Sequence, residues 1–168
     1  MREREAGSGK REAGSGKKSV IAGAGSGMEC KFCRIVSKEL SAAVVLEDEF
    51  CMAFLDIRPL FHGHCLLVPR THHETMEDLP ESLVAPFFSD AKLLCRAVRE
   101  ATASEGTFVA INNTISQSVP HLHVHVVPRK RKDGLKGFFW PRTPYADDLQ
   151  MRETAERVRA AVEKLKIQ

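Results

Sequence analysis

Between His121 and Val127 the chain reads His-Leu-His-Val-His-Val-Val, so that histidines alternate with aliphatic residues. Successive side chains of a β-strand point to opposite faces, and this period of two predicts a strand over 122–127. The three imidazoles should share one face of that strand, while the aliphatic side chains share the other. The chain must therefore fold around a sheet that has one apolar face and one face carrying histidines.

The rest of the sequence predicts a mixture of helices and strands around this segment. Asp48-Glu49 separates two apolar β-branched runs and predicts a hairpin, and Pro80 is tolerated in the first turn of a long helix that Gly106 should end. The expected elements are a helix over 29–38, strands over 43–47, 50–55 and 65–69, a helix over about 79–101, strands over 107–111 and 122–127, and a helix over 147–165. This order predicts an α+β fold with about five strands and two main helices, not a doubly wound sheet.

Residues 1–27 differ from the remainder in composition. They hold a tandem repeat, at 4–10 and 11–17, and seven of the eleven glycines of the chain. Such a segment buries too little apolar surface to offset the entropy of ordering it, and we expect a disordered tag or linker. Residues 28–168, at a length suited to one core, should form a single domain.

The charge and the cysteine content of the chain indicate which partners it can bind and in which cellular compartment it is found. Residues 1–27 carry six Lys or Arg against three Glu, which accounts for the whole formal charge of +3. The near-neutral remainder disfavours a nucleic-acid partner, because such proteins need a large basic excess. No apolar run is long enough to span a membrane, and five cysteines cannot all pair within one chain. We therefore expect a cytoplasmic protein.

Three alternating histidines suit more than one chemistry. They could simply cover a half-polar sheet face, or they could ligate a catalytic metal, although no carboxylate that would orient such ligands lies nearby in sequence. Imidazole is also a competent nucleophile at phosphorus, because it is largely neutral near pH 7. These alternatives stay open on the residues alone.

Several further motifs occur in a set order around the three histidines, and together they resemble the histidine triad (HIT) family over about Glu29 to Arg142. The motifs are Asp56-Ile57 followed by Pro59, Gly63-His64 leading into Leu66 to Pro69, Asn112, Gln117-Ser118-Val119, and the triad His121, His123 and His125. The pattern is most similar to the small purine-nucleotide phosphoramidases and dinucleoside polyphosphate hydrolases, which form homodimers through a shared sheet.

This resemblance implies a HIT-like fold and a hydrolase that attacks the α-phosphate of adenosine phosphoramidates or dinucleoside polyphosphates. A covalent nucleotidyl-histidine intermediate is implied as well. The alternative is a nucleotide-binding or partner-binding module with little turnover, and a metal-dependent hydrolase is a third possibility.

Roles carried over from the family fall on matching positions of this sequence. His123 would be the nucleophile, His125 would bind phosphate oxygens, His64 would close the cluster, and His121 would carry a proton. Ser118 would assist the leaving group, and Asn112 and Gln117 would hold the phosphate loop. Asp56 would accept from the ribose hydroxyls, and Ile57 would also bind the nucleotide. Phe32, Ile35 and Phe54 are candidates for an apolar slot for the base, although core packing explains all three equally well.

Cys30-Lys-Phe-Cys33 has the spacing of a metal-ligand pair. Some bacterial relatives bind zinc through such a pair, a histidine that corresponds to His72 and the first triad histidine, here His121. The resemblance therefore implies a structural zinc site, and inert thiols or a redox pair are the alternatives. Two further segments have open roles: Arg129 to Lys132 is either a solvated turn or a site for outer phosphates, and the aromatic segment around Trp140 either packs on the sheet or reaches the partner's site.

Overall fold

A computed structural model describes residues 30–135 and 143–166 of the chain. In chain order its elements are α1 (Lys31–Val36), β1 (Val44–Glu47), β2 (Cys51–Leu55), β3 (Cys65–Pro69), the 3-10 turn η1 (Met76–Asp78), α2 (Glu81–Thr102), β4 (Gly106–Ile111), β5 (Val124–Arg129) and α3 (Asp148–Lys166). The chain divides into two compact units, 1–131 and 132–168, of which the second contains α3. No helix within the described ranges is long and apolar enough to cross a bilayer.

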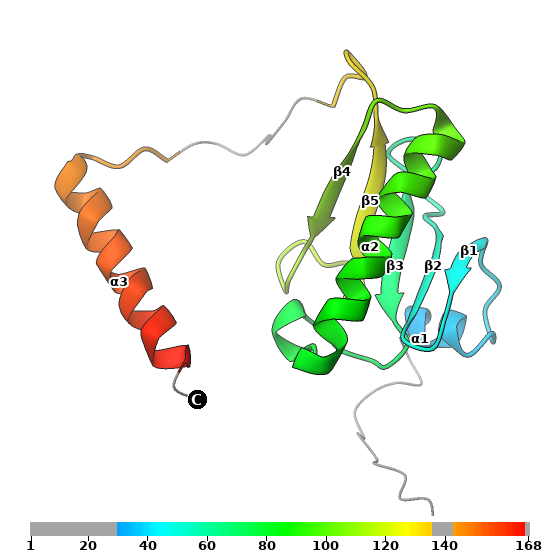
Figure 1. The fold of residues 1–168 in the computed structure, drawn as a ribbon, viewed down its shortest axis with the longest axis horizontal. Coiled ribbons are helices and arrows are strands. Elements are labelled where there is room, and N and C mark those ends of the chain that lie inside the picture. The colour runs from blue at the N-terminus through cyan, green and yellow to red at the C-terminus, as the bar shows by residue number, and fades with distance from the viewer. Residues whose placement is uncertain (1–29, 136–142, 167–168) are drawn as a thin grey trace, which may run out of the picture. The chain divides into compact units, whose positions relative to one another are not determined.

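The first unit is built on one antiparallel sheet of five strands in the order β1-β2-β3-β5-β4 (Figure 1). This arrangement confirms the α+β fold predicted from the sequence. The hairpin over β1 and β2 and the two later strands also form as expected. Because β3 pairs with β5, the segments that carry His64 and His125 become neighbours although they lie far apart in the sequence.

Side chains from the two faces of the sheet enter two separate apolar clusters. Along β2, Cys51 and Ala53 enter the cluster built with α2, whereas Met52 and Phe54 enter the cluster that contains Phe32 of α1. The α2 side of the first cluster is a stripe spaced at helical intervals, which consists of Phe87, Ala91, Leu94 and Val98. The long helix therefore seals one face, and the short helix α1 packs against the other.

Several element boundaries differ from those predicted. The last strand begins at Val124 and not at 122, and α1 covers only Lys31–Val36. Gly106 does not end the long helix, because the chain leaves it at Ala103, which adopts a left-handed conformation with φ 47°; Gly106 instead opens β4. Pro86 lies inside α2, which continues across it as the helix predicted over about 79–101 requires, although proline removes one backbone hydrogen bond of that helix.

Gly63 is the residue that turns the chain into β3, immediately before His64. Its φ is +96°, and a Cβ at this position would lie 2.5 Å from Cγ2 of Thr102. Any other residue would meet both backbone strain and a steric clash, so the position requires glycine.

We expect Gly63→Ala to lower the free energy of unfolding by about 1–3 kcal/mol, measured by urea denaturation. Gly134→Ala is the matched control, because Gly134 also has a positive φ of +85° but has open space around the position of a Cβ. An equal loss in both variants would show that the clash with Thr102 contributes nothing.

Candidate functional site

The alternation of the histidine segment persists although only His125 lies within β5. Leu122, Val124 and Val126 enter the core cluster beneath α2. The rings of His121 and His123 lie on the other side, where they contact Phe32 edge-on at centroid distances of 5.9 and 5.3 Å. The His125 ring follows at 4.9 Å from that of His123. The structure thus brings the three imidazoles together on one face.

A hydrogen bond fixes the tautomer of His123. Its Nδ1 lies 2.7 Å from the carbonyl oxygen of His121, and the side chain is 3% exposed. A carbonyl can only accept, so we assign the hydrogen to Nδ1. The neutral imidazole then keeps a lone pair on Nε2, which is the form that a nucleophile needs.

A second chain of hydrogen bonds orients His125. The backbone N–H of Leu60 donates to Nδ1 of His64 at 3.2 Å, so Nε2 of His64 carries a hydrogen and donates it to Nδ1 of His125 at 3.0 Å. His125 must then carry its own hydrogen on Nε2. Oδ2 of Asp56 lies 3.6 Å from Nδ1 of His64, which is too long for a hydrogen bond.

Burial keeps these imidazoles neutral. It lowers the pKa of His64 despite the opposing effect of Asp56. Burial, with smaller contributions from His123 and His64, lowers the pKa of His125 to about 4. The hydrogen that His125 presents at neutral pH therefore comes from the neutral ring.

This shift predicts how stability depends on pH. An unfolded histidine titrates at its ordinary pKa of 6.5, whereas the folded His125 has a pKa of about 4. The unfolded chain therefore binds more protons than the folded chain between these two pH values. The contribution of His125 to the free energy of unfolding should be present above pH 6.5 and should be lost as the pH falls toward 4. Urea denaturation of wild type and His125→Gln at pH 7, 6, 5 and 4 measures it: the difference between the two should change across this window. Parallel pH profiles would contradict the assignment.

An open cavity of about 510 Å³ lies beside the triad. Eight residues predicted from the sequence line it: Phe32, Ile35, Phe54, Asp56, Ile57, Ser118, His123 and His125. Leu40, Ala42 and Leu66 line it as well and were missed. Alternation along β3 separates Leu66 from Leu67, but nothing in the sequence states which of the two faces the histidines.

Four of the predicted catalytic and nucleotide-binding residues lie outside the lining of this cavity, namely His64, His121, Asn112 and Gln117. Gln117 ties down the loop before the triad: its Oε1 accepts from the N–H of Thr114 at 2.8 Å, and its Nε2 donates to the carbonyl of Glu74 at 2.5 Å. The neighbour of Asn112, Asn113, accepts from the N–H of Met76 at 2.9 Å. This loop is thus anchored to the segment around η1.

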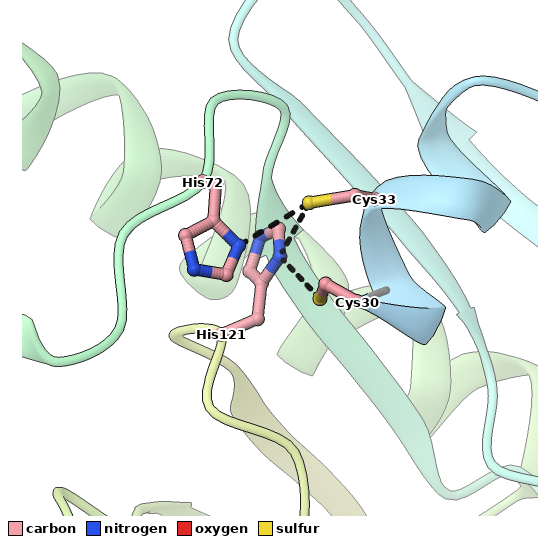
Figure 2. A group of neighbouring side chains, drawn as sticks. All are labelled: Cys30, Cys33, His72 and His121. Atoms are coloured by element: carbon pink, nitrogen blue, oxygen red, sulfur yellow. Dashed lines mark hydrogen bonds between the residues drawn. The ribbon is translucent and has the colours of Figure 1, made fainter. Parts of the chain in front are cut away.

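The second cluster of the site combines two cysteines and two histidines from three separate parts of the chain (Figure 2). Both Sγ atoms of Cys30 and Cys33 lie 3.5 Å from Nδ1 of His121, and that of Cys33 lies 3.2 Å from Nδ1 of His72. His121 donates from Nε2 to the carbonyl of Pro69 at 2.9 Å, which leaves the lone pair of Nδ1 directed at the sulfurs.

The geometry of this cluster fits a tetrahedral metal ion. Ordinary Zn–S and Zn–N bonds place a sulfur and a nitrogen ligand about 3.5 Å apart, close to the separations found here. Burial and the adjacent Cys30 raise the pKa of the Cys33 thiol to about 11, and a divalent ion is what would deprotonate it. Two thiols and two imidazoles form a donor set that suits zinc.

Of the two remaining candidate segments, the structure describes only the basic run 129–132. In the basic run, Nε of Arg131 forms an ion pair with Glu105 at 3.2 Å, which agrees with a solvated turn. Trp140 and its aromatic neighbours at 137–142 lie outside the described residues, as do residues 1–27.

Comparison with known proteins gives consistent matches. A model of the HIT domain matches residues 37–132. The chain is 38% identical over 109 residues to an adenylylsulfatase, HINT3, of Arabidopsis thaliana, an alignment that covers 64% of this chain and 55% of that protein. It is 33% identical over 109 residues to the adenosine 5'-monophosphoramidase HNT1 of Saccharomyces cerevisiae, which covers 63% of this chain and 66% of the relative.

Solved structures share the fold. A protein of Streptococcus mutans superimposes with a TM-score of 0.75 at 30% identity, covering 84% of this chain and 89% of the other. A Zn-bound histidine triad family protein of Mycobacterium smegmatis superimposes with a TM-score of 0.62 at 35% identity, covering 80% and 99%.

Proposed function

The chain belongs to the HIT domain family, and on that premise we propose that it hydrolyses adenosine phosphoramidates or dinucleoside polyphosphates at the α-phosphate, through a covalent nucleotidyl-histidine. The observation that carries the proposal is the hydrogen bond from Nδ1 of His123 to the carbonyl of His121, because it leaves Nε2 unprotonated in a residue that lines the cavity. Relatives named as a monophosphoramidase and an adenylylsulfatase support a hydrolase of nucleotides.

The reaction would proceed in two displacements. Nε2 of His123 attacks the α-phosphorus and forms a P–N bond while the bond to the leaving group breaks; Ser118, which also lines the cavity, donates a proton to an amine leaving group or a hydrogen bond to a phosphate one. Water then attacks the same phosphorus, the P–Nε2 bond breaks, and a nucleoside monophosphate leaves. The proton that the water gives up returns to Ser118 or, after a phosphate has left, passes to solvent. The His121 carbonyl stabilises the positive charge that the substituted ring carries through Nδ1–H.

The neighbouring histidines would bind and position the phosphate group, His125 directly and His64 through His125. His125 carries its hydrogen on Nε2 and can donate it to a non-bridging oxygen. His64 acts on the substrate only through His125, whose orientation and tautomer it sets, and is therefore a positioning residue. Asn112 and Gln117 would hold the loop that presents Ser118.

The other end of the cavity would hold the nucleoside. Oδ1 of Asp56 already accepts from the N–H of Arg58 at 2.8 Å, which fixes the carboxylate so that its remaining lone pairs can accept from the ribose diol. Phe32, Ile35 and Phe54 would form the apolar slot for a purine, with the exposed Ile57 closing over it.

We also propose that Cys30, Cys33, His72 and His121 hold a structural zinc ion. Zinc in a closed site of this kind supplies no reaction chemistry and cross-links the chain. The ligand separations, the donor set and the Zn-bound relative from Mycobacterium smegmatis support this assignment.

Assembly and location are further parts of the proposal. β4 is an edge strand of the sheet, and Val109 on it and Leu93 on α2 are 45% and 51% exposed, which favours a homodimer through that edge. All five cysteines are free thiols, which suits a reducing cytoplasm. Residues 1–27 would be a tag or linker without a part in the reaction.

Turnover of adenosine 5'-phosphoramidate and of diadenosine polyphosphates, followed by chromatography of the AMP released, tests the function. We expect hydrolysis to be slowed but not abolished when EDTA removes bound metal, since no step uses a metal. Complete loss of turnover in EDTA, with the protein still folded, would favour a metal-dependent hydrolase. Nucleotide binding without turnover would leave a binding module.

A further inference from the structure

We infer that the Cys30–Cys33–His72–His121 cluster, when it holds its metal, positions the nucleophile His123 in addition to stabilising the fold. The inference rests on the proposed function, because it concerns the same His123. Two separate contacts connect the cluster to that residue, one through the backbone of His121 and one through the ring of Phe32.

The first contact is the His121 carbonyl. The His121 side chain is 0% exposed, its Nε2 is tied to the carbonyl of Pro69, and its Nδ1 faces both sulfurs. A metal bound at Nδ1 would add to the Pro69 hydrogen bond at Nε2, so that both ring nitrogens would be held, and with them the residue whose carbonyl accepts the hydrogen of His123 Nδ1. That carbonyl selects the tautomer of His123, whereas an imidazole without such a partner populates both tautomers.

The second contact is the packing of the Phe32 ring against the ring of His123. This residue lies between the two cysteines in sequence, and its ring contacts His123 edge-on at 5.3 Å with an interplanar angle of 79°. It belongs to α1, a helix of six residues whose N-cap, Cys30, provides no side-chain cap. So short a helix has little stability of its own, and metal–sulfur bonds would anchor it at the position that holds Phe32 against the nucleophile.

These contacts predict an effect of metal loss that a metal ion which only cross-links the chain would not have. Loss of the metal should lower kcat even in molecules that remain folded, because part of the His123 population would carry its hydrogen on Nε2 and could not attack. Removal of a positioning partner of this kind costs about 10- to 100-fold. His72 is the ligand best suited to test it, because it contacts Cys33 and His121 but does not line the cavity.

The experiment compares His72→Asn with the matched control His73→Asn in the full chain. His73 is the adjacent histidine; it lies outside the cluster, and the bond that Leu122 donates to it uses its backbone carbonyl. For each protein we would measure zinc content, the ¹⁵N shifts that report the His123 tautomer, and kcat and KM for adenosine 5'-phosphoramidate below the melting temperature. His72→Cys keeps a metal-binding donor and should restore all readouts.

We expect His72→Asn to lose zinc, to show mixed His123 tautomers and to lose about tenfold or more in kcat. His73→Asn should match wild type. If His72→Asn does not fold, zinc-free wild type prepared by chelation in the cold replaces it. A folded, zinc-free protein with a single His123 tautomer and unchanged kcat would overturn the inference. The His123 tautomer and the zinc content can be measured without turnover. If wild type hydrolyses no substrate, but His72→Asn still shows mixed tautomers where wild type shows one, the proposed function fails and this inference stands.

Discussion

Replacing His123 with alanine is expected to lower hydrolysis by about 10³-fold or more while AMP binding remains largely intact. In the proposed reaction the imidazole forms a bond to phosphorus in the transition state, whereas affinity for the product would come from Asp56 and the apolar lining of the cavity. Steady-state turnover and calorimetric binding of AMP measure the two effects separately. His62→Ala, a change at an exposed histidine outside the cavity, is the control.

The same variant tests the covalent step. Wild type mixed with radiolabelled substrate and quenched in alkali should retain label on the protein, and His123→Gly should retain none. Turnover by His123→Ala within about tenfold of wild type would remove this residue from the role of nucleophile.

Serine substitution at Cys30 and Cys33 should have the largest effect on stability. We expect wild type purified without added metal to contain one zinc ion per chain, and the double variant to contain none. Several kcal/mol of binding free energy would then be lost from the folded state, which corresponds to a fall in Tm of about 10 °C or more. Metal analysis and calorimetry measure both.

Cys95→Ser provides the control for this change, since Cys95 is a half-buried thiol of α2 that lies outside the cluster. It should keep its zinc and melt close to wild type. A wild-type zinc content near zero, together with unchanged Tm in the double variant, would leave Cys30 and Cys33 as plain buried thiols.

Most of the fold could be predicted from periodicity and turn residues. The Asp48-Glu49 turn, the α2 stripe and the alternating histidine segment are local patterns, and each appears in the structure where the sequence places it. The errors lie at element ends. Strand pairing with β3 starts only at Val124, so 121–123 alternate without belonging to β5, and this limit depends on a partner strand that sequence alone does not identify.

The candidate site was predictable as a set of residues but not as a geometry. Resemblance and spacing brought together His64, His125 and the four cluster residues, which the structure places within contact of one another. The groups that set the tautomers are backbone atoms, namely the carbonyls of Pro69 and His121 and the N–H of Leu60. Every residue carries such atoms, so composition holds no signal for which of them will face an imidazole.

The alternation of the histidine segment also governs how this chain can change over generations. Deleting one residue between His121 and His125 would exchange the two sides downstream of the cut, carrying an ionisable ring beneath α2 and expelling an aliphatic side chain from a fully buried position. A substitution in this segment can therefore replace one side chain without moving the others. The gain or loss of a single residue would exchange the two faces, and the fold does not tolerate it. His121, His123 and His125, for which we propose the roles of metal ligand, nucleophile and phosphate ligand, therefore need their fixed separation along the chain.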